Sequence, residues 1–272
     1  MVDMLGIQAA LDRHVSGSPS QRELLRAAAL LAAFTAQTVT NMGQPLEARR
    51  WWRTARNTAD RSGDPYSAVW ARSREIQRTA ESRPLPATLR LIAEAESMAG
   101  QAPPAATLAL LQAKAQTFAL AARKRDALEA LSLLRAQFDQ SPTGYHGSIL
   151  TWGQEVLHGT ESFCYARLGN FPKAEMATKA GLNLMAENGS TSKRHTADFQ
   201  LYLAFALVRT GDVGEGLRHA QHVIMGLPSA YRANSVKDGQ VLLDMVPVSE
   251  QQSTTVKSYR EWVSSLSVSA AS

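Results

Sequence analysis

Apolar residues recur at intervals of three and four along most of the chain, and this spacing is typical of amphipathic α-helices. Alanine and leucine, which are good helix formers, dominate the sequence, whereas runs of β-branched residues are scarce. No stretch alternates between apolar and polar residues for long enough to predict a strand. The pattern therefore predicts an all-α fold.

Short turns interrupt the helical pattern about every forty residues, and this period predicts a repeated helical hairpin. The clearest hairpin is YARLGNFPKAEMATKAGLNL, residues 165–184. The turn positions of the five expected hairpins are Gly43, Ser82, Ala122, Gly169 and Gly211. Glycine suits the left-handed conformation that ends many helices. Because one hairpin cannot bury the apolar stripes of both its helices, the hairpins are expected to stack.

The best-preserved hairpin, residues 155–182, resembles the tetratricopeptide repeat (TPR) family. Tyr165 falls at the family's inner-helix aromatic position, Gly169 at its turn and Ala174 at its close-packing position. The equivalent small residues of the five hairpins are Ala48, Ala87, Ala127, Ala174 and Gly216. The second hairpin departs from the pattern, because two of its small or apolar positions hold acidic residues, Glu75 and Glu94. The resemblance implies a superhelical solenoid of about five degenerate TPR-like hairpins plus capping helices.

A narrower resemblance is to the C-terminal repeat region of actinobacterial XRE-type helix-turn-helix regulators. It is carried by residues 48–64, 166–184, 206–232 and 256–266. Those regulators have a DNA-binding domain before the repeats, whereas only about twenty residues precede the repeats here, too few for a domain with its own core. We therefore expect no direct contact with nucleic acid. The chain is either a truncated regulator or a free-standing relative.

The repeats divide the chain into an N-terminal lead-in (1–20), a repeat solenoid (21–246), and a C-terminal capping helix with a flexible tail (247–272). The most apolar run, residues 24–34, is too short to cross a bilayer, and it is not placed like a signal sequence. A single cysteine, Cys164, allows no disulfide within the chain and suits a structural thiol in a reducing compartment. These features predict a cytoplasmic protein that is not bound to a membrane.

The net charge of +5 is compatible with anionic partners but does not require them. The nearest approaches to a basic cluster are residues 123–125 and a set of four arginines, which we interpret as solvated helix faces. The four are Arg49, Arg50, Arg53 and Arg56. His219 and His222 share a helix face, but no third metal ligand accompanies them, so neither a metal nor a cofactor is expected.

The TPR resemblance implies that the first helix of each hairpin lines an inner surface on which ligands bind. The polar and aromatic residues carried over to this surface are Gln37, Arg72, Gln112, Gln116, Phe163, Arg167, Asp198, Phe205 and Arg209. Arginine suits carboxylate or phosphate, while phenylalanine and glutamine suit an extended peptide or a small metabolite. The leading hypothesis is a regulatory sensor or adaptor that holds a peptide, metabolite or protein partner. The alternative for the arginines is solvation near helix ends.

Two other functions stay open. The chain could be an enzyme that uses the long connection and following helix at 141–158, although no G-x-S-x-G, P-loop or H-E-x-x-H motif is present. Its acid–base candidates would be Tyr145, His146, His158 and His195. It could also be the scaffold of a homodimer that pairs through the C-terminal helix around Trp262.

Overall fold

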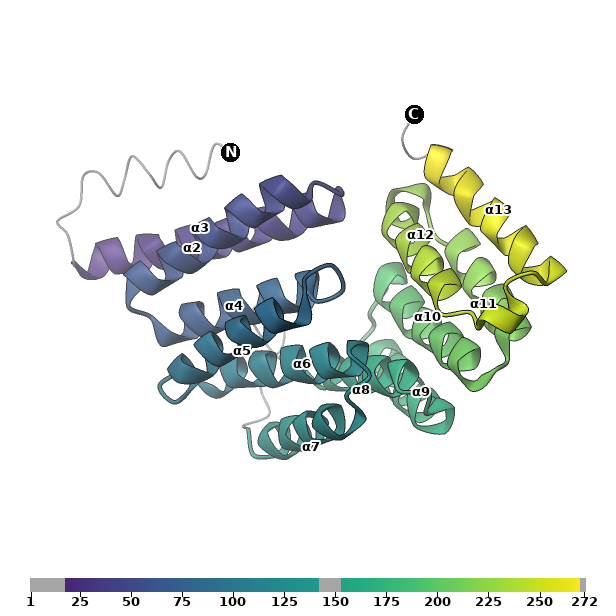
Figure 1. Ribbon diagram of the computed structural model, residues 1–272. Helices are drawn as coiled ribbons and strands as arrows, with labels where there is room; N and C mark the ends of the chain where they lie inside the picture. Colours follow the sequence, from purple (N-terminus) through teal and green to yellow (C-terminus); the bar gives the residue numbers. More distant parts are fainter. Residues whose placement is uncertain (1–17, 142–152, 270–272) are drawn as a thin grey trace. The chain divides into compact units, whose positions relative to one another are not determined.

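The computed structural model describes residues 18–141 and 153–269, and every regular element within those ranges is helical (Figure 1). This confirms the all-α prediction. The elements are α2 (Pro19–Asn41), α3 (Pro45–Ser62), α4 (Pro65–Thr79), α5 (Leu85–Ala99), α6 (Pro104–Leu120), α7 (Lys124–Asp139), α8 (Gln154–Arg167), α9 (Phe171–Glu187), α10 (Lys193–Thr210), α11 (Val213–Met225), α12 (Ser229–Asp244), a 3₁₀ turn η1 (Val248–Glu250) and α13 (Thr254–Ser269).

Each of the five predicted turn positions lies between two helices. Gly43, Gly169 and Gly211 have φ values of 72°, 72° and 99°, the left-handed conformation expected of a glycine that ends a helix. Ala122, the third turn position along the chain, also has a positive φ, 55°. This conformation is less favourable for alanine than for glycine, because alanine has a side chain. The turn positions could therefore be predicted from the sequence.

The chain divides into two compact units. Unit 1 comprises Met1–Ala121 and Arg125–Trp152, which includes α2 to α6 and nearly all of α7. Unit 2 comprises Ala122–Lys124 and Gly153–Ser272, which includes α8 to α13. The expected solenoid, 21–246, has no internal boundary, whereas unit 1 ends at Trp152, within the long connection noted in the sequence.

In unit 1, the helices α2, α4 and α6, which begin successive hairpins, contact one another in that order. An alanine-rich seam joins α2 to α3, and Trp52 and Trp70 fill the space beside it. The seam residues include Ala29, Ala32, Ala36, Ala48, Ala55 and Ala59. Small side chains allow the helix backbones to approach closely, so the predicted close-packing position Ala48 lies in this seam.

In unit 2, α8 packs on α9, α10 packs on both α8 and α11, and α13 packs on α11 and α12. Leu201, Phe205 and Ile224 belong to its largest apolar cluster, which Tyr259 and Val263 of α13 complete. Gly216 is a point of close approach, because a Cβ atom there would lie 2.9 Å from the carbonyl oxygen of Ala204. Trp262, the suggested dimer contact, is half-buried against this cluster.

Candidate functional site: an arginine-lined pocket in unit 1

Helix α3 has two contrasting faces. Ala48, Trp52, Ala55 and Ala59 are buried against the rest of unit 1. The other face carries four arginines at helical spacing, and these are Arg49, Arg50, Arg53 and Arg56. The apolar face anchors the helix, so the position of the basic face is fixed by the core of unit 1.

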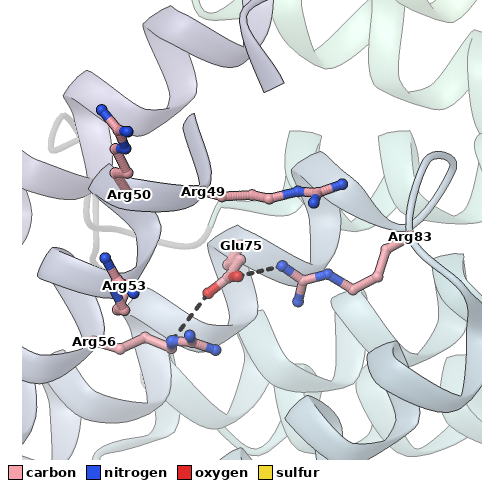
Figure 2. A pocket seen from close by; sticks show the side chains of 6 residues that line it. All are labelled: Arg49, Arg50, Arg53, Arg56, Glu75 and Arg83. Carbon is pink, nitrogen blue, oxygen red and sulfur yellow. Dashed lines mark hydrogen bonds and ion pairs between the residues drawn. The ribbon is translucent and has the colours of Figure 1, made fainter. Parts of the chain in front are cut away.

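The arginines of α3 form one wall of a pocket of about 430 Å³. The opposite side is formed by Glu75 of α4 and by Arg83 of the segment between α4 and α5. Figure 2 shows Arg49 and Arg83 extending toward one another from these two elements, with Glu75 between Arg83 and Arg56. Five arginines and one glutamate thus line the pocket.

Glu75 is the fixed negative charge of the pocket and is only 2% exposed. Its Oε1 accepts a hydrogen bond from Nη2 of Arg83, and its Oε2 lies 3.3 Å from Nε of Arg56. The second contact is an ion pair that lacks hydrogen-bond geometry, so Oε2 accepts no hydrogen bond. A buried carboxylate is costly unless it is paired, so Arg56 and Arg83 explain how an acidic residue occupies a small-residue position of the repeat.

The other arginines of the pocket are less well compensated. Arg50 pairs with the half-buried Glu47 of its own helix at 3.5 Å. Arg49 and Arg53 make no ion pair or hydrogen bond with any residue in the described ranges. Five guanidinium groups and one carboxylate leave the lining with a net charge of four positive units. The pocket therefore attracts anions.

Arg72, one of the predicted ligand-binding residues, is paired with carboxylates within unit 1. It donates two hydrogen bonds of 2.8 Å to the carboxylate of Asp60, and its Nε lies 3.5 Å from Glu94. Burial lowers the pKa of Arg72, but the hydrogen bonds and charges of Asp60 and Glu94 outweigh it, so the pKa lies above its ordinary value. Arg72 thus joins α3, α4 and α5, and it explains Glu94, the second departure from the repeat pattern.

The remaining predicted residues of unit 1 lie on α2 and α6 and do not line the arginine pocket. Gln37 and Gln116 are half-buried. Gln112 accepts a hydrogen bond of 3.0 Å from Nε2 of Gln77 and so helps to join α6 to α4. The structure does not test whether these amides bind a ligand, and their assignment stays a prediction.

Three predicted residues of unit 2 come together. The guanidinium carbon of Arg167 lies 4.1 Å from the ring centroid of Phe205 and 5.3 Å from that of Phe163. Its Nη1 also donates to the sulfur of Met245 at 3.4 Å. Arg167 is 8% exposed, so it is packed inside unit 2. Asp198 pairs with Arg194 at 2.8 Å, and Arg209 is exposed.

The structure describes two of the four acid–base candidates. Tyr145 and His146 lie outside the described residues. Nδ1 of His158 lies 3.3 Å from Glu161 on α8, whereas His195 is exposed in the first turn of α10. Within the ranges that the structure describes, no three histidine, cysteine, aspartate or glutamate side chains form a possible metal site.

Two other titratable residues, Cys164 and His219, have pKa values that burial shifts. Cys164 is fully buried, and this burial, together with the charge of Glu161, raises the pKa of its thiol, as suits a structural residue. Nε2 of His219 lies 3.0 Å from Oε1 of Gln200. Burial lowers the pKa of His219, which favours its neutral form.

The components of the pocket are visible in the sequence, but their spacing does not predict that they lie together. Considered alone, the arginines of α3 are expected to form a solvated face, and Glu75 is a departure from the repeat pattern. Arg83, in the segment between two helices, was not singled out at all. The available signal was the coincidence of an acidic residue in a packing position with a stripe of arginines on the preceding helix.

Comparison with protein-family models, curated proteins and solved structures finds no match to this chain. Of the helices that the structure describes, none combines the length and apolar character needed to cross a membrane.

Proposed function

We propose that this chain is a TPR-like binding protein, a regulatory sensor or adaptor, whose unit 1 binds an anionic ligand in the arginine pocket. The observation that carries the proposal is the excess of arginine over acidic residues around one hollow. Two of these arginines, Arg49 and Arg53, make no contact with a counter-charge among the described residues. Guanidinium groups bind carboxylates and phosphates through paired hydrogen bonds, so an anion supplies the partners that these residues lack.

The size of the pocket supports a small ligand. A volume of about 430 Å³ falls within the range of sites that hold small molecules. Its walls come from α3, α4 and the segment after α4, so arginines of two separate segments, Arg49 and Arg56 of α3 and Arg83, face the same pocket (Figure 2). Glu75 holds Arg56 and Arg83 in place before a ligand arrives, which reduces the entropy lost on binding.

The packing of the helices supports the TPR-like part of the proposal. Helices α2, α4 and α6 are in sequential contact in unit 1, as are α8, α10 and α12 in unit 2. Contact between the first helices of consecutive hairpins is what stacking of repeats requires. A sensor or adaptor function fits a protein that binds through such helices, and it remains the hypothesis that the sequence resemblance implies.

The binding proposal is tested by isothermal titration calorimetry with tripolyphosphate and with citrate, at fixed ionic strength. R49A/R53A should weaken the binding of at least one of these anions by about tenfold or more, because charged hydrogen bonds contribute about 1.5–3 kcal/mol each.

The matched control is R61A/R90A, which removes the same charge from exposed arginines of unit 1 that do not line the pocket. The control should bind within about twofold to threefold of the wild type, since only long-range attraction changes. Equal losses in the two double variants would show that net charge alone attracts the anions, and this result would overturn the proposed site.

A further inference from the structure

We infer that the ligand of the arginine pocket carries a diphosphate group, and this inference rests on the proposed anion-binding function. The first argument is the extent of the basic wall. Arg49 and Arg56 are seven residues apart on α3, which corresponds to about 10 Å along the helix axis. A single phosphoryl group offers three acceptor oxygens around one phosphorus atom. Two linked phosphoryl groups present more oxygens over a greater length, and so reach more of these guanidinium groups.

The second argument is charge. The pocket lining has an excess of four positive charges, and Glu47, which pairs with Arg50 but does not line the pocket, offsets one of them. A phosphate monoester carries about −1.5 to −2 at neutral pH, which leaves part of that excess uncompensated. A diphosphate ester adds a second ionised phosphoryl group and matches the excess more closely. Lining charge therefore favours two phosphoryl groups over one.

The third argument concerns shape. The acceptor directions of a carboxylate lie mainly in one plane, whereas the oxygens of a phosphoryl group are arranged tetrahedrally. The guanidinium groups approach from two directions, since Arg49 and Arg56 extend from α3 and Arg83 extends from the segment after α4 (Figure 2). Tetrahedral oxygens can accept from both sides at once, so the geometry favours phosphoryl groups over the carboxylates of a similarly charged organic acid.

The hydrogen bonding of the Arg53 guanidinium group can be tested separately from its positive charge. Because Arg53 makes no ion pair or hydrogen bond with a described residue, its replacement by lysine removes no contact within the fold. The same holds for Arg49. Lysine keeps the positive charge but presents a point charge where arginine presents a planar fork. R49K/R53K therefore tests whether paired hydrogen bonds to phosphoryl oxygens determine the preference.

The experiment is calorimetry with orthophosphate, pyrophosphate and citrate in the presence of EDTA, so that no divalent metal bridges protein and anion. Wild-type protein should bind pyrophosphate about tenfold more tightly than either other anion. R49K/R53K should lose most of that preference, whereas the control R61K/R90K should keep it. Circular dichroism should show the same helix content in all three proteins.

Three contrary results have separate meanings. If pyrophosphate and citrate bind equally, and both are lost in R49A/R53A, the pocket binds anions but the diphosphate inference is wrong. If the wild type binds none of the anions more tightly than R49A/R53A does, both the inference and the proposed function are wrong. A pyrophosphate preference that R49K/R53K retains in full would also overturn the inference, because charge alone would then produce it.

Discussion

Two groups of arginines, one in each unit of this protein, have opposite surroundings. In unit 1, Arg49 and Arg53 border a hollow, and the buried carboxylate of Glu75 pairs with other arginines of the same pocket. In unit 2, Arg167 is packed between the rings of Phe163 and Phe205, and Met245 accepts one of its hydrogen bonds. Neither use follows from residue type alone. The comparison shows that the surrounding side chains decide whether an arginine stabilises the fold or is available to a ligand.

The largest effect on stability is expected at Glu75. E75A removes the carboxylate that separates Arg56 from Arg83 and leaves a space where a buried side chain was. Breaking a buried pair costs about 3–5 kcal/mol. Arg56 and Arg83 are partly exposed and can turn toward water, so we expect a loss of about 2–3 kcal/mol.

Urea unfolding measures this loss, and E94A is the control. Glu94 is more exposed and its contact with Arg72 is 3.5 Å, so its removal should cost less than about 1 kcal/mol. Equal losses for E75A and E94A would contradict the role of Glu75 as the structural counter-charge of the pocket.

A smaller effect is expected from R167A, and it should appear in stability alone. Arg167 contacts two aromatic rings through its guanidinium group and is nearly buried, so its removal should destabilise the protein by about 1–2 kcal/mol. Pyrophosphate affinity should be unchanged, because Arg167 does not line the pocket. If R167A lost pyrophosphate binding but kept the stability of the wild type, Arg167 would be a ligand-binding residue, and the contrast between the two units would be wrong.

The smallest effect tests how tightly unit 2 is filled. A methyl group at Gly216 would crowd the carbonyl oxygen of Ala204 at 2.9 Å, which costs about 1–3 kcal/mol. Alanine is the better helix former by about 1 kcal/mol, so the net loss for G216A should be about 1 kcal/mol. G214A is the matched control, because the nearest atom to its added methyl group is the flexible end of Arg218 at 3.7 Å. G214A should be neutral or stabilising in thermal unfolding; a loss equal to that of G216A would contradict this account.

Local signals predicted the helices and their turns because each depends on a few neighbouring residues. Left-handed glycines such as Gly43 and Gly211 end helices wherever they occur, and proline begins α2, α3, α4 and α6. Phe163, Arg167 and Phe205 were predicted together because they follow the spacing of the repeat. Their burial was not predicted, since it depends on Met245, which lies 78 residues from Arg167 in the chain.

The sequence alone does not show that the residues of the arginine pocket lie together, because they come from three separate segments. Arg83 lies eight residues after Glu75, in a connection whose direction no helical periodicity determines. Glu75 and Glu94 were visible as departures from the repeat, but their arginine partners could be identified only once α3, α4 and α5 were placed side by side. A charged residue in a packing position was therefore the most informative feature of the sequence.

The central claim is that the arginine pocket of unit 1 is an anion-binding site, and a crystal structure of the protein with pyrophosphate tests it most directly. The account predicts electron density for the anion between α3 and the segment after α4, within hydrogen-bonding distance of Arg49, Arg53 and Arg83. Pyrophosphate bound at another surface of the molecule, with the pocket occupied only by water, would contradict it.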